Sequence, residues 1–348
     1  MRAMIRKEFL EMRRDRRTVA LMVGLPLMLL IIFGYAARFD VTSIDTVVVG
    51  PGAERFAAGL NPVFNAVEVD PSAGVDRARR RLTDSEAPIA FVTGGPVTTM
   101  LVDGTQLFVA QSALRRIPPG TAPDILFNPE LDTAPVMVPS LIGLILLFVG
   151  TVITSLGVVR ERESGTLEQL AVMPLRPVDV TIGKIAPYFV VAVVDMAVVT
   201  LAGLWIFGVP FVGSPILFGV YSLVFLFVVL GLGVAISTVS RSQGEAIQLA
   251  IMALLPQIML SGMIFPLESM AAGVRWIGYV LPLTWFVAGM RGIFLKGSSV
   301  ATLAVPLAYL TVMAIVVFGV AVTRFRRELG QRSSPGRAGA VAAEGGGR

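Results

Sequence analysis

Long apolar runs separated by short polar stretches dominate this amino-acid sequence. Six runs are long enough to cross a bilayer, because about 20 helical residues rising about 1.5 Å each cover a hydrocarbon core of about 30 Å. The six runs cover residues 19–37, 136–158, 184–207, 216–239, 246–265 and 300–323. This pattern predicts a mainly α-helical, polytopic membrane protein with six transmembrane helices.

Between the first two runs, residues 38–135 change to short alternating segments that end in turn residues. Such segments are typical of β-strands, and charged amphipathic segments between them are typical of helices. The predicted strands are residues 46–50, 66–70, 88–94 and 99–104, and the predicted helices are residues 53–60 and 75–82. Gly94, Gly95 and Pro96 predict a hairpin between the last two strands. Residues 115–123 are expected to return the chain to the membrane, which makes an α+β domain inserted between helices 1 and 2.

Residues 266–296 are too interrupted for a single spanning helix, because Pro266, Gly273 and Pro282 break the apolar pattern. The same stretch carries the aromatic residues Trp276, Tyr279 and Trp285. Such side chains prefer the boundary between membrane and water. We therefore expect two short re-entrant helices in the outer leaflet.

The distribution of basic residues predicts the orientation of these helices. Short loops rich in Lys and Arg stay in the cytoplasm, and such residues precede the first run and follow the second, fourth and sixth. The loop of residues 208–215 has no basic residue. Both termini are therefore expected in the cytoplasm and the α+β domain outside. The formal charge of +5, with 55% hydrophobic and only 15% charged residues, fits this topology better than binding to nucleic acid.

The two ends of the chain are expected to be cytoplasmic accessory segments. Residues 1–18 place Met1, Ile5 and Phe9 on one helical face, which predicts an amphipathic helix at the bilayer interface. The apolar run that follows is longer than the core of a cleaved signal peptide, so we interpret it as an uncleaved anchor. Residues 324–348 are low in complexity and are predicted to form a disordered tail.

The absence of Cys and His from the sequence excludes several classes of site. Disulfides and thiol catalysis need Cys, and His is the commonest metal ligand and the usual general base near neutral pH. Asp195 lies in the middle of the third run, but one carboxylate cannot form the paired site of an intramembrane enzyme. We therefore expect no catalytic residue, metal or cofactor in this chain.

A charged stretch, RERESGTLEQLAVMPLRP at residues 160–177, separates the second and third runs. Thr166 and Gln169 have the spacing of a capping box, which predicts a helix that begins near Leu167. Pro174 ends it, because the residue before a proline avoids the helical conformation. From these residues alone, the helix either rests on the membrane surface as part of a solvated loop or docks on a cytoplasmic partner and moves two spans together.

Six stretches of the chain together carry a family resemblance. They are MVPSLIG, VVRERESGTLEQLAVMPLRPVDVTIGKIAPY, LSGMIFPLESM and LPLTWFVAGMRGIFLKG, together with IRKEFLEMRRDRR and VDGTQLFVAQSAL. These stretches resemble the permeases of bacterial drug exporters in the ATP-binding-cassette type 2 (ABC-2) family. The resemblance covers nearly the whole chain. It implies a multi-pass protein of the bacterial inner membrane that exports drugs or other amphipathic small molecules.

The resemblance also implies partners. ATP and Mg²⁺ would bind a separate ATPase subunit, a second permease subunit would complete a homo- or heterodimer, and a periplasmic adaptor is a further candidate. The sequence has no Walker A motif, because Lys184 is followed by Ile185 and the first Gly is replaced by Val178. The implied ATPase-coupling residues are Glu161, Arg162, Glu163, Gly165, Thr166, Leu167, Glu168, Gln169 and Leu170.

Three polar residues are candidates for a transport pathway. Asp195 is mid-span, where a charge is costly, so it either lines a pathway or makes a hydrogen bond between helices. Glu245 and Gln248, at the start of the fifth run, either help to admit substrate or begin a solvated helix. Gly231 and Ala235 have a small-xxx-small spacing that predicts close helix packing.

The alternative function is a membrane receptor or scaffold whose outer domain senses a ligand. A receptor of this kind would usually carry a cytoplasmic signalling domain. The predicted cytoplasmic segments of this chain are short, which favours the transporter.

Overall fold

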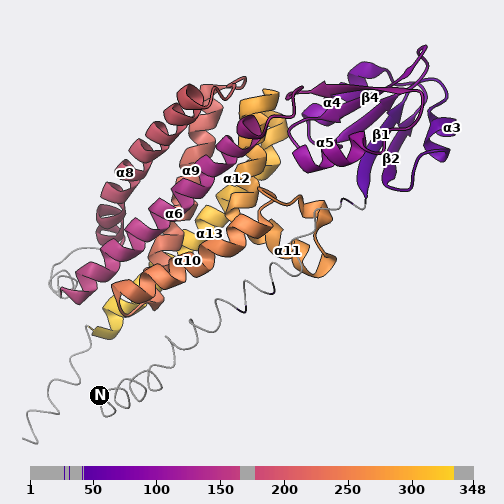
Figure 1. Cartoon of the computed structure of the whole chain (residues 1–348). Coiled ribbons are helices and arrows are strands. Elements are labelled where there is room, and N and C mark those ends of the chain that lie inside the picture. Colours follow the sequence, from indigo (N-terminus) through magenta and orange to yellow (C-terminus); the bar gives the residue numbers. More distant parts are fainter. Residues whose placement is uncertain (1–26, 28–30, 32–40, 42, 165–176, 333–348) are drawn as a thin grey trace, which may run out of the picture.

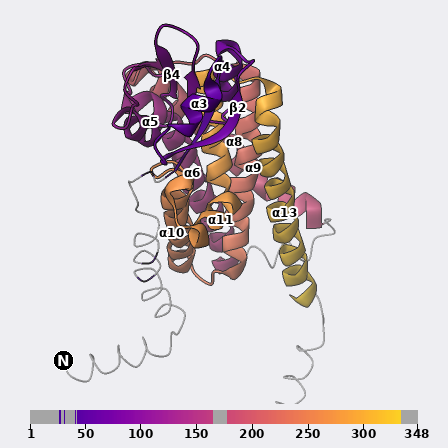
Figure 2. The same cartoon turned by 90° about the vertical axis from the view of Figure 1, so that its right-hand side faces the viewer.

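The computed structural model describes residues 27, 31, 41, 43–164 and 177–332 of the 348. A sheet domain covers one end of a bundle of long helices (Figures 1 and 2). The predicted interfacial helix at residues 1–18 and nearly all of the predicted first span lie outside the described residues. The same is true of residues 165–176 and 333–348.

The sheet domain is built on five strands in the order β2-β1-β3-β4-β5. The strands are β1 (Ile44–Val49), β2 (Phe64–Asp70), β3 (Ile89–Val92), β4 (Thr98–Asp103) and β5 (Thr121–Leu126). Three helices, α3 (Ala53–Ala58), α4 (Val75–Thr83) and α5 (Leu107–Leu114), connect them. Only β3 and β4 pair antiparallel, with Phe91 opposite Met100, so the predicted hairpin is confirmed.

The structure corrects the sequence prediction for this domain in two ways. The other strand pairs are parallel, because a helix crosses over between β1 and β2, β2 and β3, and β4 and β5. The domain is therefore a mixed α/β sheet rather than an α+β arrangement. Residues 115–123 do not run directly to the membrane, because they lead into β5. Pro123 obscured this strand in the sequence, and it is tolerated because β5 is an edge strand.

Five helices of the bundle are each long and apolar enough to cross a membrane. They are α6 (Thr133–Glu163), α8 (Pro177–Ile206), α9 (Pro215–Val239), α10 (Gln243–Leu260) and α13 (Val300–Arg332). They correspond to the last five predicted runs, and the mainly helical membrane fold is confirmed. Several helices extend beyond the apolar run, since charged residues such as Arg and Glu also favour helix. For this reason α13 continues through residues 324–332, where a disordered tail was predicted.

The interrupted region forms two short helices, as predicted. After a 3-10 turn, η1 (Leu267–Ser269), come α11 (Ala272–Val280) and α12 (Pro282–Arg291), and then a π-helical turn, η2 (Gly292–Lys296). The axes of Gly273–Val280 and Pro282–Lys296 differ by 75°. Pro282 occupies the first turn of α12, where its missing N–H costs nothing. Phe286 of α12 is fully buried and stacks on Phe225 of α9 at a centroid distance of 4.1 Å, so α12 belongs to the core of the bundle.

Glycines let the long helices approach closely. A Cβ atom on Gly233 of α9 would lie 2.7 Å from the Cβ of Thr154 on α6, and one on Gly231 would lie 2.9 Å from Val317 on α13. The predicted close packing at Gly231 is confirmed. Such contacts supply the van der Waals attraction that holds helices together where lipid removes the hydrophobic driving force.

Candidate coupling and transport sites

The last turn of α6 is joined to the turn between α9 and α10. Arg162 donates from Nη1 to the carbonyl oxygen of Ser240 at 2.8 Å. Glu163 accepts from the backbone N–H of Gln243 at 3.2 Å and from its side-chain Nε2 at 2.6 Å. These bonds connect residues that are 78 and 80 positions apart in the sequence. The structure thus places the beginning of the predicted coupling segment, Glu161 to Glu163, in α6 and against a second helix pair.

Glu245 has a local structural role at the start of α10. Ser242 caps this helix by accepting a hydrogen bond from the backbone N–H of Glu245 at 3.2 Å. The Glu245 carboxylate in turn accepts from the backbone N–H of Arg241 at 2.7 Å. The arrangement resembles a capping box, so it favours the helix-start interpretation of Glu245 over a pathway role. Gln248 is half-buried one turn further along α10.

Asp195 lies on α8 at the boundary between buried and exposed faces. Ala192 and Met196 beside it are buried, whereas Val194 and Val198 are exposed. Its Oδ2 atom is buried and accepts no hydrogen bond from any described residue. The helix–helix hydrogen bond that the sequence left open is therefore not made to this oxygen within the described chain. A mid-span carboxylate in this position needs water, a proton or a partner.

The predicted pathway residues do not form one cluster. Asp195 is on α8, and Glu245 and Gln248 are on α10, on the opposite side of α6 in Figure 1. The coupling residues Gly165, Thr166, Leu167, Glu168, Gln169 and Leu170 lie outside the described residues. Across the described part of the chain, no group of three or more acidic side chains could hold a metal ion.

A buried ion pair that sequence reasoning missed joins the sheet domain to the helices. Lys296, the last residue of η2, donates from Nζ to Asp103 at 2.6 Å. The same ammonium donates to the carbonyl oxygen of Leu82 at 2.9 Å and to Ser85 Oγ at 2.7 Å. Its nitrogen lies 5.4 Å from the ring centre of Phe127. The side chain of Lys296 is 2% exposed and that of Asp103 is fully buried, so all three ammonium donors are satisfied by protein.

Additional contacts extend this junction. The second oxygen of Asp103 accepts from the backbone N–H and the hydroxyl of Thr105 at 3.0 and 2.7 Å. Thr302 of α13 donates to Asp84 at 2.7 Å, and Ser298 donates to the carbonyl oxygen of Thr83 at 3.4 Å. The end of α4 and the end of β4 are therefore both fixed to the η2–α13 region. The only feature of the sequence that could have indicated this ion pair was a Lys and an Asp that each follow an apolar run.

Comparison with known proteins identifies the family. The family model described as ABC-2 family transporter protein matches residues 96–323. This chain belongs to the ABC-2 transporter family. The match contains Asp103, Lys296, Asp195 and the last turn of α6, so both the end of α6 and the buried ion pair lie in the part of the chain that the family model covers. The resemblance stated from the sequence motifs is confirmed.

Relatives of this ABC-2 protein extend over nearly its full length. It is 29% identical to the "Probable multidrug ABC transporter permease YbhS" of Escherichia coli K12, across 94% of this chain and 97% of that protein. It is 26% identical to the "Probable multidrug ABC transporter permease YbhR" of Escherichia coli K12, across 94% of this chain and 98% of that protein. The "Inner membrane transport permease YhhJ" of Escherichia coli K12 is 35% identical over 59% of this chain and 55% of its own length. No solved structure gives a significant match.

Proposed function

We propose that this chain is the membrane subunit of an ATP-driven exporter that moves drugs or other amphipathic small molecules out of the cell. The observation that carries the proposal is the end-to-end similarity to proteins named multidrug ABC transporter permeases. The match to YbhS covers 97% of a protein that is itself named a permease, which supports an ATPase on a separate subunit. Two permease subunits, each supplying half of a pathway, would complete the exporter.

The proposed orientation puts the end of α6 in the cytoplasm and the sheet domain outside the inner membrane. The positive-inside pattern supports it, since Arg160, Arg162 and Arg241 lie at the α6 and α9 ends far from the sheet domain. Apolar side chains remain exposed along α8 and α13, such as Val190 at 61% and Ile315 at 68%. Lipid or a second permease subunit would cover these faces.

The proposed mechanism is mechanical and involves no covalent chemistry in this chain. Closure of the ATPase pair on nucleotide would push residues 161–170, which begin in the last turn of α6 and precede α8 in the sequence. The bonds from Arg162 and Glu163 to the α9–α10 turn would pass the same displacement to α10. A rigid connection at this point would let one docking segment move three spans together.

The test is a double substitution in the docking segment, Glu168→Lys with Leu170→Asp. We expect normal membrane insertion and loss of the stimulation that the permease gives to ATP hydrolysis by its partner, because the docking face is reversed in charge and made polar. The matched control is Glu54→Lys with Val67→Asp, which makes the same charge reversal and replaces an apolar residue with Asp at exposed positions of the sheet domain. Full stimulation in the docking variant would reject the coupling role.

A further inference from the structure

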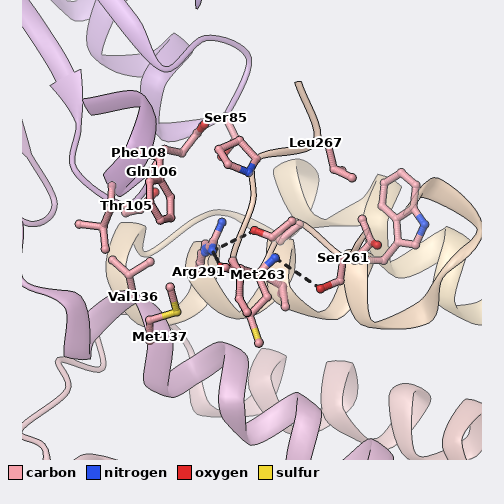
Figure 3. A pocket seen from close by; sticks show the side chains of 18 of the residues that line it. Ser85, Thr105, Gln106, Phe108, Val136, Met137, Ser261, Met263, Leu267 and Arg291 are labelled. Carbon is pink, nitrogen blue, oxygen red and sulfur yellow. Dashed lines mark hydrogen bonds between the residues drawn. The ribbon is translucent and has the colours of Figure 1, made fainter. Parts of the chain in front are cut away.

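A cavity of about 340 Å³ lies where the sheet domain meets the bundle. Figure 3 shows side chains from both parts around it, and they include Gln106, Phe108, Met137, Met263 and Arg291. They come from the region of α5, from α6, from the turn after α10, and from α12. This volume falls in the range of about 300–1,000 Å³ that is typical of small-molecule sites.

The wall of the cavity is rich in aromatic rings and thioethers. Phe108, Tyr279 and Trp285 line it together with two methionines. Trp285 is held in place, because its Nε1 donates to the carbonyl oxygen of Tyr279 at 2.8 Å and its ring stacks on Tyr309 at a centroid distance of 4.0 Å. Flexible, polarizable Met side chains adapt to flat rings. The wall therefore suits an aromatic ligand and is largely pre-formed.

The two basic residues that line the cavity already have partners. The charge of Lys296 is matched by Asp103, and Arg291 donates from Nη2 to the carbonyl oxygens of Gly262 and Met263, both at 3.2 Å. An anion would lose its hydration, and to pair with Arg291 it would have to displace these carbonyl oxygens, because the Nε atom of Arg291 is buried. Among the described residues that line the cavity, none is acidic, so a cation would find no counter-charge there. An uncharged ligand avoids both costs.

Gln106 places a side-chain amide on the wall of the cavity. Gln106 is half-buried, and its amide makes no hydrogen bond with any other side chain or backbone group of the described chain. An amide offers both a donor and an acceptor. It can therefore pair with a hydroxyl or carbonyl group on a ligand.

We infer that this cavity binds an uncharged aromatic small molecule with one hydrogen-bonding group. Because its walls come from both the sheet domain and the bundle, binding depends on the junction that Lys296 holds. In an exporter the cavity would be a binding site on the outward side of the transport route. That last role rests on the proposed function, whereas the binding itself does not.

The test uses the full chain in phosphatidylcholine nanodiscs, without ATPase or nucleotide. Trp205→Phe and Trp276→Phe leave Trp285 as the one fluorescent indole of the three in the chain. Three nitroaromatic quenchers share one ring and differ in charge: para-nitrobenzyl alcohol, para-nitrobenzoate and para-nitrobenzylammonium. We expect saturable quenching by the alcohol, with an affinity at least about tenfold above that for either ion, equivalent to about 1.4 kcal/mol.

Two variants separate binding in the cavity from partition into lipid. Ala288 is an exposed residue on the cavity wall, so Ala288→Phe should fill the space and weaken the alcohol about tenfold or more. Ala197→Phe, at an exposed position of α8 away from the cavity, should leave the affinity unchanged. Gln106→Leu should weaken binding of the alcohol less than Ala288→Phe does.

Equal quenching in the Ala288→Phe and parent proteins, or equal affinity for alcohol and ions, would overturn the inference. Neither result bears on ATPase stimulation, so the two proposals fail independently.

Discussion

At the scale of single residues, the most consequential contact is the Lys296–Asp103 pair. Taking two charges out of water is costly, and here the cost is offset by the ion pair, by the hydrogen bonds that Lys296 donates, and by those that Asp103 accepts. Removal of one partner leaves an uncompensated charge, whereas removal of both leaves two neutral groups. This difference in free energy can be measured.

We predict that Lys296→Met lowers the free energy of unfolding by about 3–5 kcal/mol, because the Asp103 carboxylate then stays buried without its ion-pair partner. Lys296→Met combined with Asp103→Asn should be more stable than Lys296→Met alone, since the amide oxygen can still accept from Thr105. Thermal unfolding of the purified chain in detergent gives both values. The prediction is wrong if the double variant is no more stable than Lys296→Met.

Asp195 has an unmet hydrogen-bonding requirement, because its buried Oδ2 has no donor among the described residues. If this carboxylate serves the pathway or gating, Asp195→Asn should reduce export severalfold while the amount of protein in the membrane stays constant. Efflux from cells and immunoblotting of membranes measure the two quantities. Normal efflux together with reduced assembly would instead indicate a packing role.

At the scale of elements, α6 is the central helix of the bundle. It packs against α8, α9, α10 and α12, and its last turn is bonded to the α9–α10 turn. The packing of α6 on α9 requires small residues, because Thr154 leaves no room for a side chain opposite it. Because α6 packs against this many helices, a displacement of its last turn can be transmitted to several of them.

The glycines of α9 provide a matched test of this packing. Gly233→Ala should lower the free energy of unfolding by about 1–3 kcal/mol, because its Cβ would overlap Thr154. Gly219→Ala on the same helix meets nothing within 4 Å and should change stability by about 1 kcal/mol or less, in the stabilising direction. Thermal unfolding of both variants measures the difference, and equal stability would contradict close packing of α6 on α9.

At the scale of the whole molecule, the sheet domain is bonded to the bundle at several points. Contacts from Lys296, Ser298 and Thr302 fix the ends of α4 and β4. In the proposed orientation, movement of α12 and α13 during transport would therefore be passed directly to the domain outside the membrane.

The absence of Cys from the sequence makes this orientation easy to test. Val67→Cys places a thiol on the exposed surface of the sheet domain, and Arg241→Cys places one at the exposed α9–α10 turn. In intact spheroplasts, a membrane-impermeant maleimide should label the Val67→Cys protein and should label the Arg241→Cys protein only after lysis. The reverse labelling pattern would invert the topology and remove the coupling site from the cytoplasm.

The sequence determined the elements whose signal is local. Five predicted spans and four predicted strands appear in the described chain, because hydrophobic periodicity and turn residues depend only on near neighbours. The family motifs also followed from the sequence, and the family match bears them out. β5 was missed because Pro123 hides an edge strand from any rule based on strand composition.

Only the tertiary structure decided which distant residues meet. Lys296 and Asp103 are 193 positions apart, and Glu163 and Gln243 are 80 apart, so no local pattern could pair them. The cavity arises in the same way, from walls that belong to the sheet domain, α6, α12 and the turn after α10. Such contacts depend on how whole helices pack, which is set by the combined shape of many side chains rather than by any short stretch of sequence.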